Sequence, residues 1–297
     1  MLMDKFLAYI PDDGHPVFDV GIASADGVEW HLSADANECN NSHSATKAII
    51  AAGIGILRDK SKLSLNDCVL SFFKKEDLPE QIDERWNCVT IEYALQHKMG
   101  LGEGSGLKGI DEPDSRDNIG DDFLKHIFSV KLVHEPGTFR QYSDAAYYIL
   151  SRIMHAVSGQ TADKFLLENL LNPVGFHECA FGCCPKGHPI GGGAFYARSD
   201  DMARFAYLYA NEGICNGKQL ISKEWIELSA ANDYAWTPFR ETDIFVKTGA
   251  RGQMVAYSKS KRVGISWHGC CSTGGNDRND RFLEAFEKVL ANYNMNT

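Results

Sequence analysis

Two kinds of hydrophobic pattern divide the chain. Near the N-terminus, two strand-like runs, 17–22 and 28–32, flank a turn at Asp26-Gly27, and together they predict a β-hairpin. The middle of the chain is dominated by apolar residues at helical spacing. Strand-like runs then return at 243–246, 253–257 and 262–267. The pattern therefore predicts an antiparallel sheet built from both ends of the chain.

Helices are predicted from apolar spacing and from capping residues. Residues 2–10 and 282–290 are amphipathic, and Thr90 is the predicted N-cap of a helix over 91–97. The other expected helices are 145 to about 159, 162–171 capped by Thr161, and 202–212 capped by Asp200 and closed by Gly213.

These elements predict a mixed α/β (α+β) fold in a single domain, 1–297. We expect one subdomain from 1–60 and 238–297, containing the sheet, and a mainly helical subdomain over 61–237. The first and last helices should cover one face of the sheet and the helical insertion the other, with a cleft suited to a ligand between insertion and sheet. A chain of 297 residues that is 44% hydrophobic can bury such a core.

The first candidate chemistry is a serine one helical turn before a lysine. Ser44 and Lys47 precede the apolar run 48–57, so a helix there would place both on one face and carry the lysine into apolar surroundings. Because burial disfavours an ammonium ion, we expect a lowered pKa for Lys47 and a neutral amine that accepts the serine proton. First-turn N–H groups would stabilise an oxyanion.

The S-x-x-K spacing alone is weak, because it occurs at Ser44, Ser71, Ser105 and Ser258. Ser71 precedes a charged stretch, Ser105 lies in a glycine-rich segment, and Ser258 falls in a lysine-rich run expected to be a hairpin turn. Ser44 opens an apolar helix and is the favoured nucleophile. The alternative for this motif taken by itself is an ordinary helix start with a solvated lysine.

Composition narrows the partners and the compartment. A net charge of −10 and a pI near 5.5 oppose nucleic acid and anionic membranes as partners. The N-terminal residues lack the continuous apolar core of a signal peptide, and no run approaches membrane-spanning length. Nine cysteines, an odd number, suit a reducing compartment better than a disulfide framework. We therefore expect a cytoplasmic protein.

One cluster of histidines and cysteines invites a metal interpretation. His177, Cys179, Cys183, Cys184 and His188 lie close in sequence, but their spacing fits no ordinary zinc finger or ribbon. Cysteines that act as small buried hydrophobic residues are the simpler interpretation. We expect neither a metal nor another cofactor, and zinc is the alternative.

Two further motifs are expected at the cleft. Tyr142-Ser143-Asp144 precedes a helix, and Lys247-Thr248-Gly249 lies at a strand-like position. Each is weak alone, since a loop tyrosine usually packs and Tyr209-Ala210-Asn211 also matches Y-x-[ND]. The order S-x-x-K, Y-x-[ND], K-T-G resembles that of the penicillin-recognising serine hydrolases, in the branch of class C β-lactamases, D-alanyl-D-alanine carboxypeptidases and related esterases.

The resemblance covers nearly the whole chain. Residues 62–67 are similar to the family's segment after the nucleophile helix, and 97–101 to its H-T-S-G-L stretch. Residues 191–193, which lead into 199–205, match its glycine turn and the following helix. The fold that this implies is β-lactamase/transpeptidase-like, an antiparallel sheet flanked by N- and C-terminal helices plus a mainly helical subdomain.

The resemblance also implies roles for the motif residues. Ser44 would be the acylated nucleophile with Lys47 as its base partner, and Tyr142 would carry the proton to the leaving group and help to activate the deacylating water. Lys247 would add positive potential. The backbone N–H groups of Ser44 and Ala250 would form the oxyanion hole. The implied substrate-binding residues are Asp144, Thr248, Gly249 and Arg251.

Several positions depart from the family pattern. Asp144 stands where asparagine is commoner, and a carboxylate there would favour the charged form of Lys47 and weaken it as a base. Lys247 replaces the histidine of many esterase-like relatives, which favours carboxylate-bearing substrates. The interval between Tyr142 and Lys247 is short, so part of the pocket wall is expected to be missing.

The sequence thus predicts a serine hydrolase that acts through an acyl-enzyme on a small-molecule ester or amide. A β-lactamase or D-alanyl-D-alanine carboxypeptidase acting on a β-lactam or peptide is the enzymatic alternative, and a catalytically inactive binding or assembly module is an alternative of another class. His268 is expected to be a satisfied core histidine. Arg251 could meet a substrate carboxylate or be an ordinary exposed arginine.

Overall fold

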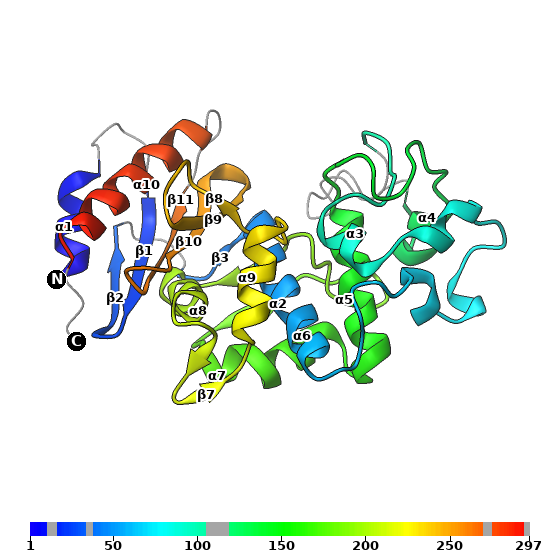
Figure 1. Cartoon of the computed structure of the whole chain (residues 1–297), viewed down its shortest axis with the longest axis horizontal. Coiled ribbons are helices and arrows are strands. Elements are labelled where there is room, and N and C mark those ends of the chain that lie inside the picture. Colours follow the sequence, from blue (N-terminus) through cyan, green and yellow to red (C-terminus); the bar gives the residue numbers. More distant parts are fainter. Residues whose placement is uncertain (11–16, 34–37, 105–118, 270–274, 294–297) are drawn as a thin grey trace.

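The computed structural model describes residues 1–10, 17–33, 38–104, 119–269 and 275–293, with the backbone alone for 275–278. Figure 1 shows two parts side by side, a sheet with its flanking helices and a mainly helical part. The main sheet has the strand order β2-β1-β11-β10-β9-β8. Its strands are β1 (Val17–Ser24), β2 (Gly27–Leu32), β8 (Thr237–Pro238), β9 (Ile244–Gly249), β10 (Gln253–Ser258) and β11 (Val263–Gly269).

The sheet joins the two ends of the chain. Strands β1 and β2 form the predicted hairpin, in which Ser24 pairs with Gly27, and β1 also pairs antiparallel with β11, so that Val20 lies opposite Trp267. Strands β9, β10 and β11 continue as an antiparallel meander. The mixed α/β architecture and the three late strands predicted from the sequence are therefore confirmed.

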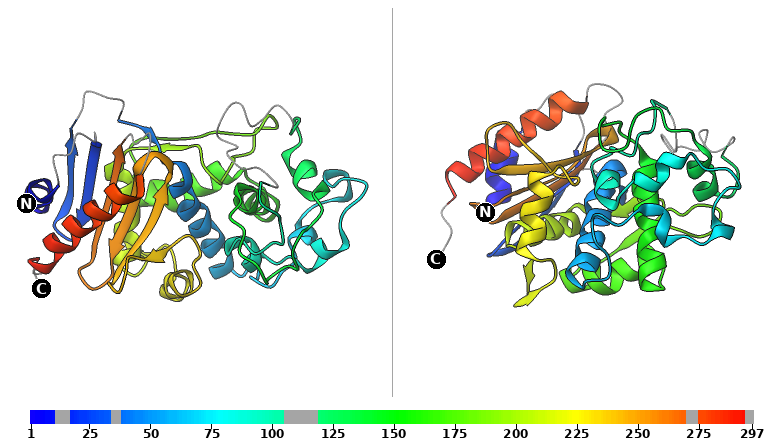
Figure 2. Two further views of the ribbon diagram at one scale, coloured as in Figure 1. Left: turned by 90° about the horizontal axis from the view of Figure 1, so that it is seen from above. Right: turned by 45° about the vertical axis from the view of Figure 1, so that its right-hand side comes forward.

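The two terminal helices cover one face of this sheet, as predicted. Helices α1 (Leu2–Tyr9) and α10 (Gly275–Ala291) lie together over it, and both views in Figure 2 show α10 crossing the strands. Phe6 stacks on Trp267 at 6.2 Å between ring centroids, and Phe282 packs edge-on against the same indole at 5.4 Å. These rings belong to a core made of sheet and terminal-helix residues together with Phe239 from the turn between β8 and β9.

Helix α8 (Ser199–Ala210) packs on the opposite face. Glycines in the sheet make this close approach possible: a Cβ on Gly21 would lie 2.5 Å from the backbone of Asp200, and one on Gly264 would lie 2.4 Å from the backbone nitrogen of Tyr207. Any side chain at these two positions would push the helix away, because heavy atoms cannot approach so closely.

The start of α8 corrects one prediction. Asp200 does not cap a helix that begins at 202, because the helix begins at Ser199. The Ser199 N–H is satisfied instead by Asp19 on β1, whose Oδ2 accepts it at 3.1 Å, and Asp200 lies in the first turn with its carboxylate on Arg198 at 2.9 Å. A carboxylate distant in sequence thus takes the capping role.

The helical part is built around α2 (Thr46–Asp59) and α5 (Asp144–Ser158), which pack against each other. The predicted cap at Thr90 is confirmed, since its hydroxyl accepts the Tyr93 N–H at 3.2 Å, and Gly159 ends α5 in a left-handed conformation (φ 74°). The other helices are α3 (Ile91–Leu95), α4 (Phe123–Ser129), α6 (Ala162–Leu166), α7 (Asn172–Val174) and α9 (Lys223–Ala231), with a π-helical turn at Leu167–Leu171.

Short elements complete the described chain. The small strands are β3 (Asn40–Asn41), β4 (Cys179–Phe181), β5 (Phe195–Ala197), β6 (Ile214–Cys215) and β7 (Lys218–Gln219), and the 3₁₀ turns are His43–Ala45, Val69–Phe72, Lys75–Asp77, Glu84–Cys88 and Ala250–Gly252. The division into subdomains 1–60 with 238–297 and 61–237 stays a prediction.

Candidate active site

Ser44 lies on a 3₁₀ turn, His43–Ala45, that leads into α2. The turn is tightly held: Asn41 Oδ1 accepts the His43 N–H at 2.8 Å, and the Thr46 hydroxyl donates to the His43 carbonyl at 2.5 Å. His43 has a φ of 45°, a strained value for a residue with a side chain. The serine therefore projects from a fixed turn just before the helix.

The Ser44 hydroxyl lies between two other predicted site residues. Tyr142 donates its hydroxyl to Ser44 Oγ at 2.7 Å, and Lys47 Nζ donates to the same oxygen at 3.3 Å. Tyr142 reaches the serine from the segment before α5, whose N-cap Ser143 accepts the Ala145 N–H at 3.2 Å. The structure therefore brings together Ser44, Lys47 and Tyr142, as the sequence predicted.

Lys47 is fully buried and closely surrounded. Its Nζ lies 2.5 Å from Asp144 Oδ1 and 2.5 Å from the Gly192 carbonyl oxygen, in addition to the contact with Ser44. The ring of Tyr142 lies 4.7 Å from this nitrogen, measured to the ring centroid. Asp144, the first residue of α5, is thus a direct partner of Lys47.

The predicted fall in the pKa of Lys47 is wrong. Burial does disfavour the ammonium form, but the charge and hydrogen bond of Asp144, together with Tyr142, outweigh it and raise the pKa of Lys47 above the ordinary lysine value. The lysine is consequently an ammonium ion at neutral pH. The sequence argument considered the apolar helix and gave the charge effect of Asp144 too little weight.

Lys247, on β9, also lies near the ring of Tyr142. Its Nζ is 5.5 Å from the tyrosine ring centroid, and its side chain makes no hydrogen bond or ion pair with another residue in the described ranges. Burial, and then the charges of Lys47 and Arg140, lower the pKa of Lys247 to about 7, although Asp233 and Asp144 oppose the shift. Lys247 is thus charged in only part of the molecules near neutral pH.

His97 supports the tyrosine, a contact that the sequence analysis did not identify. Its ring lies 4.4 Å from the ring of Tyr142, and its Nδ1 accepts the Ser143 N–H at 3.3 Å, which places its proton on Nε2. Burial and the charges of Lys47 and Lys247 hold the pKa of His97 well below its usual range. A neutral imidazole therefore fixes the loop that carries Tyr142.

Arg140 and Asp233 form a second unpredicted pair near the site. Arg140 Nη2 lies 3.4 Å from Asp233 Oδ2, with both side chains about half exposed. Asp233 follows α9, and burial raises its pKa, although Arg140 and Lys247 oppose this shift. Sequence spacing could not reveal the pair, because its members lie on segments 93 residues apart (233 minus 140).

The end of β9 lies directly against the serine turn. A Cβ on Gly249 would lie 2.3 Å from the Ser42 carbonyl oxygen and 3.3 Å from His43 Cβ, so only glycine fits there. Ala250 and Arg251 follow on an exposed turn, in which Arg251 has a φ of 60°. The two chain segments that would supply the predicted oxyanion hole are therefore adjacent, and the hole itself stays a prediction.

Thr248 points to the other face of β9 from Lys247, because side chains alternate along a strand. It lines a pocket of about 340 Å³ between the sheet and α10. The other lining residues are Pro238, Phe239, Arg240, Val246, Met254, Asn279, Asp280 and Leu283. A substrate-binding role for Thr248 stays a prediction.

The remaining sequence candidates lie outside this cluster. Ser71 lies on a separate 3₁₀ turn, Tyr209 is buried in α8, Ser258 ends β10 with its hydroxyl on Asp243 at 2.9 Å, and Ser105 lies outside the described residues. His268 is buried and bonded to Asp19 Oδ1 at 3.0 Å, so the prediction of a satisfied core histidine is confirmed.

Within the described ranges, the histidines and cysteines between 177 and 188 do not gather their side chains into a zinc site. His177 gathers instead with Asp200 and Asp201, and its Nδ1 lies 2.8 Å from Asp201 Oδ1. Asp201 also accepts the backbone N–H groups of His177 and Glu178, so its oxygens already have donors. The grouping serves to attach the 177–178 segment to α8.

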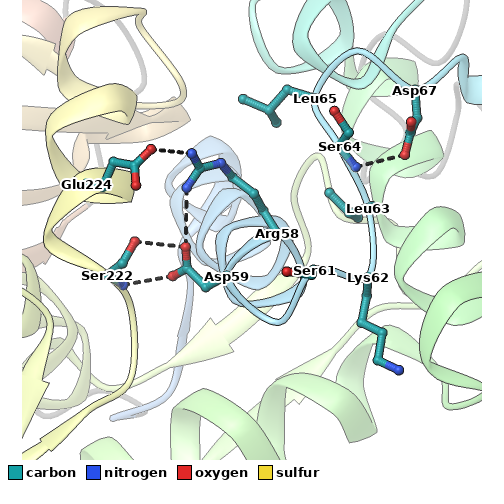
Figure 3. A pocket seen from close by; sticks show the side chains of 10 residues that line it. All are labelled: Arg58, Asp59, Ser61, Lys62, Leu63, Ser64, Leu65, Asp67, Ser222 and Glu224. Carbon is teal, nitrogen blue, oxygen red and sulfur yellow. Dashed lines mark hydrogen bonds and ion pairs between the residues drawn. The ribbon is translucent and has the colours of Figure 1, made fainter.

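A pocket of about 890 Å³ lies at the far end of α2 from Ser44 (Figure 3). Polar contacts connect the residues of its wall. Arg58 forms ion pairs with Asp59 and Glu224, and the Asp59 carboxylate accepts hydrogen bonds from the backbone N–H and the hydroxyl of Ser222, each at 2.8 Å. Because α2 has 14 residues, roughly 20 Å of helix separates this pocket from the serine turn. The pocket is no part of the candidate site.

No helix within the described ranges is both long and apolar enough to cross a membrane.

An antiparallel sheet between terminal helices and a helical part, with a serine beside a lysine and a tyrosine where the two parts meet, defines a β-lactamase-like protein. The chain belongs to the Beta-lactamase family, whose family model matches residues 6–277. The family resemblance and the fold predicted from the sequence are therefore confirmed.

Individual relatives are distant. Protein flp of Staphylococcus aureus (strain COL) is 27% identical over 141 residues, which cover 46% of this chain and 27% of that protein. The chain spans only 32% and 27% of the length of the first two curated relatives that it matches.

Solved structures match over nearly the full chain. A family VIII carboxylesterase superimposes with a TM-score of 0.77 at 17% identity, covering 97% of this chain and 96% of that one. A penicillin-binding protein homologue from Caulobacter crescentus gives 0.72 at 17% identity, with coverage of 97% and 96%. At such low identity these similarities establish the fold.

Proposed function

We propose that this protein is a serine hydrolase that forms an acyl-enzyme on Ser44 and hydrolyses a small ester or amide. One observation carries the proposal: the Ser44 hydroxyl lies 2.7 Å from the Tyr142 hydroxyl and 3.3 Å from Lys47 Nζ, on a fixed turn at the start of a helix. A nucleophile within hydrogen-bond reach of titratable groups is the arrangement that covalent catalysis needs.

In the proposed reaction, Ser44 Oγ bonds to the substrate carbonyl carbon while its proton passes into the Lys47–Tyr142 pair, the two groups within hydrogen-bond distance. The carbonyl oxygen becomes an oxyanion, stabilised by the N–H groups of Ser44 and Ala250. The bond to the leaving alcohol or amine then breaks, and Tyr142 supplies the proton that this group needs. A water molecule afterwards attacks the acyl carbon and restores the Ser44 hydroxyl.

A β-lactamase or D-alanyl-D-alanine carboxypeptidase is the second candidate, and Lys247 favours it. A half-buried lysine without a partner in the described ranges suits a substrate carboxylate. The charge of this lysine near neutral pH is only partial, however, which is why we place uncharged esters and small amides first. No nucleic acid, membrane or cofactor enters the proposal.

A catalytically inactive binding or assembly module is the alternative of another class. The raised pKa of Lys47 motivates this alternative, because a lysine held as an ammonium ion cannot be a base. The close approach of Tyr142 to Ser44 argues against it, since an inactive site has no need of that contact.

Relative rates on a p-nitrophenyl ester and a chromogenic cephalosporin test these candidates. We expect faster turnover of the ester and no turnover of either by Ser44→Ala. Ser71→Ala is the matched control, since it removes a serine of the same S-x-x-K spacing on a separate 3₁₀ turn outside the cluster. A clear preference for the cephalosporin would favour the second candidate, and activity retained in Ser44→Ala would refute the proposed nucleophile.

A further inference from the structure

A cavity of about 450 Å³ lies between the β1–β2 hairpin, the end of α7, α8 and β6. Its volume falls within the range of small-molecule sites, roughly 300–1,000 Å³. Arg204, Tyr207, Leu208 and Asn211 line it from the second half of α8 and its C-cap, and this spacing places them on one face of the helix. None of the described residues that line the cavity belongs to the serine cluster, so it is a separate feature of the molecule.

The walls of this cavity are largely apolar. Val28 from the hairpin, Val174 from α7, Leu208 from α8 and Ile214 from β6 supply apolar surface. Arg204 is the one charged side chain among the described lining residues. An apolar site with a few fixed polar groups is the usual composition of a ligand pocket.

Arg204 has a hydrogen-bond donor that no described residue satisfies. Its Nε is buried without a hydrogen-bond partner in the described ranges, and its ion pair with Asp201 Oδ1 spans 3.8 Å, longer than a hydrogen bond. The Asp201 carboxylate already lies within hydrogen-bond distance of the His177 ring and of the backbone N–H groups of His177 and Glu178. A buried donor left in this way is uncommon and indicates a missing acceptor.

The charge of Arg204 acts inside the cavity. Cys215 also lines it; burial raises the pKa of the Cys215 thiol, and the charge of Arg204 opposes this rise. The guanidinium therefore lies near the thiol. Cys215 Sγ donates to the Pro173 carbonyl at 3.4 Å, which fixes the thiol in the wall. Cys215 is thus a chemical reporter on the charged end of the cavity.

We propose that this cavity binds a small monocarboxylate with an unbranched apolar chain. The carboxylate pairs with Arg204, whose planar guanidinium matches the two oxygens of such a group. The chain lies against Val28, Val174 and Leu208, where its burial removes apolar surface from water. An inorganic anion would leave the apolar walls unused, and an alcohol of the same length would offer Arg204 only a neutral acceptor. The site is independent of the reaction proposed at Ser44.

Isothermal titration calorimetry with octanoate, acetate and octanol tests the two ends of the site. Octanoate should bind, and acetate and octanol should each bind at least about tenfold more weakly, because each lacks one of the two interactions. Equal affinities for octanoate and octanol would show that no cation holds the carboxylate. Absence of octanoate binding at millimolar concentrations would overturn the proposal.

Arg204→Gln tests the charged anchor, because glutamine removes the charge and keeps a polar side chain. The affinity for octanoate should fall at least about tenfold. Arg262→Gln is the matched control: Arg262 is exposed between β10 and β11 and is not among the lining residues, so its loss should change the affinity by less than about threefold. Equal losses in the two variants would indicate a general positive potential and would contradict the contact with Arg204.

Val28→Phe tests the apolar end. The larger side chain narrows the cavity from the hairpin and still favours a strand, so octanoate binding should be lost in a folded protein. Circular dichroism and urea unfolding establish that each variant is folded. Octanoate binding that survives both Arg204→Gln and Val28→Phe would refute the assigned cavity.

Alkylation of Cys215 locates the bound carboxylate. The protein is labelled with iodoacetamide at about pH 8.5, near the ordinary thiol pKa, and peptide mass mapping follows each cysteine separately. Octanoate should slow the labelling of Cys215 and leave that of the exposed Cys88 unchanged. Lys247→Met, which removes a cation of the serine site, should retain this protection. Protection lost in Lys247→Met, or bound octanoate that leaves Cys215 unprotected, would place the carboxylate elsewhere and overturn the proposal.

Discussion

Two lysines lie near the ring of Tyr142, and their surroundings shift their pKa values in opposite directions. Lys47 has a carboxylate 2.5 Å away, and its pKa is raised although the side chain is fully buried. Lys247 has no ion-pair partner in the described part of the chain, and its pKa falls to about 7. Both lose hydration, but Asp144 and Tyr142 raise the pKa of Lys47, whereas the positive charges of Lys47 and Arg140 add to the lowering of the Lys247 pKa.

The comparison shows which lysine can change its charge in the working range of pH. Lys47 behaves as a fixed cation within the site, whereas Lys247 titrates near neutral pH and can respond to the charge of a substrate. Burial alone therefore does not tell a base from a fixed cation, and the nearest opposite charge decides.

The largest contrast is expected in stability. Lys47→Met removes the ammonium group that neutralises the buried Asp144 carboxylate, which should lower the free energy of unfolding by about 3 kcal/mol or more. Lys247→Met removes a half-buried cation that has no ion-pair partner in the described ranges, and it should change the free energy of unfolding by less than about 1 kcal/mol. Urea denaturation at pH 7 measures both.

The double variant Lys47→Met/Asp144→Leu is the control for this result. Removing both charges should recover much of the loss, because the buried carboxylate charge is removed together with the ammonium. Equal losses for the two single methionine variants would contradict the contrast between the lysines.

A smaller effect is expected on substrate choice. If Lys247 binds a substrate carboxylate, Lys247→Met should reduce kcat/KM for an anionic ester by roughly tenfold or more and leave a neutral ester of the same size almost unchanged. In the wild type, the preference for the anionic ester should decline as the pH rises through about 7. A preference that is independent of pH up to 9 would show that Lys247 does not bind the carboxylate.

The lowered pKa of Lys247 also predicts a pH dependence of stability. The unfolded chain, with a lysine pKa near 10.5, binds a proton that the folded chain lacks between pH 7 and 10.5. The wild type should therefore gain stability relative to Lys247→Met as the pH rises through this window, by about 1 kcal/mol after allowance for solvent screening. Unfolding free energies at pH 6.5 and 9.5 test the sign, and a relative loss at pH 9.5 would contradict it.

The smallest effects are expected from the Arg140 and Asp233 pair. Arg140→Gln removes a positive charge near Lys247 and should raise its pKa, whereas Asp233→Asn removes a negative charge and should lower it, each by less than about one unit. NMR titration of the Lys247 ¹⁵Nζ signal gives both shifts. Shifts in the same direction would mean that the pair acts on Lys247 by some route other than its charge.

Local features of the fold were predictable because they depend on neighbouring residues. Asp26-Gly27 specified the hairpin turn, Thr90 specified the N-cap of α3, and Gly159 specified the end of α5. The start of α8 was not predictable in this way, because the acceptor at its first turn is Asp19 on a distant strand. Sequence spacing contains no information on such long-range contacts.

The same limit applies to the site. The order of the motifs was enough to bring Ser44, Lys47 and Tyr142 together, as the structure shows. The predicted fall in the pKa of Lys47 was wrong, whereas the opposing effect of Asp144 was named from the sequence. Which effect prevails depends on a 2.5 Å contact between residues 97 positions apart. The support of Tyr142 by His97 likewise depends on three-dimensional packing.

The most direct test of the account is an intact-mass spectrum of the protein, quenched in acid during turnover of a p-nitrophenyl ester and, separately, of benzylpenicillin, alongside Ser44→Ala. The account predicts an added acyl mass with the ester on the wild type alone, and peptide mapping should place it on Ser44. A penicilloyl adduct on the wild type would extend the site to β-lactams. An adduct of equal yield on Ser44→Ala would contradict the central claim that Ser44 is the nucleophile.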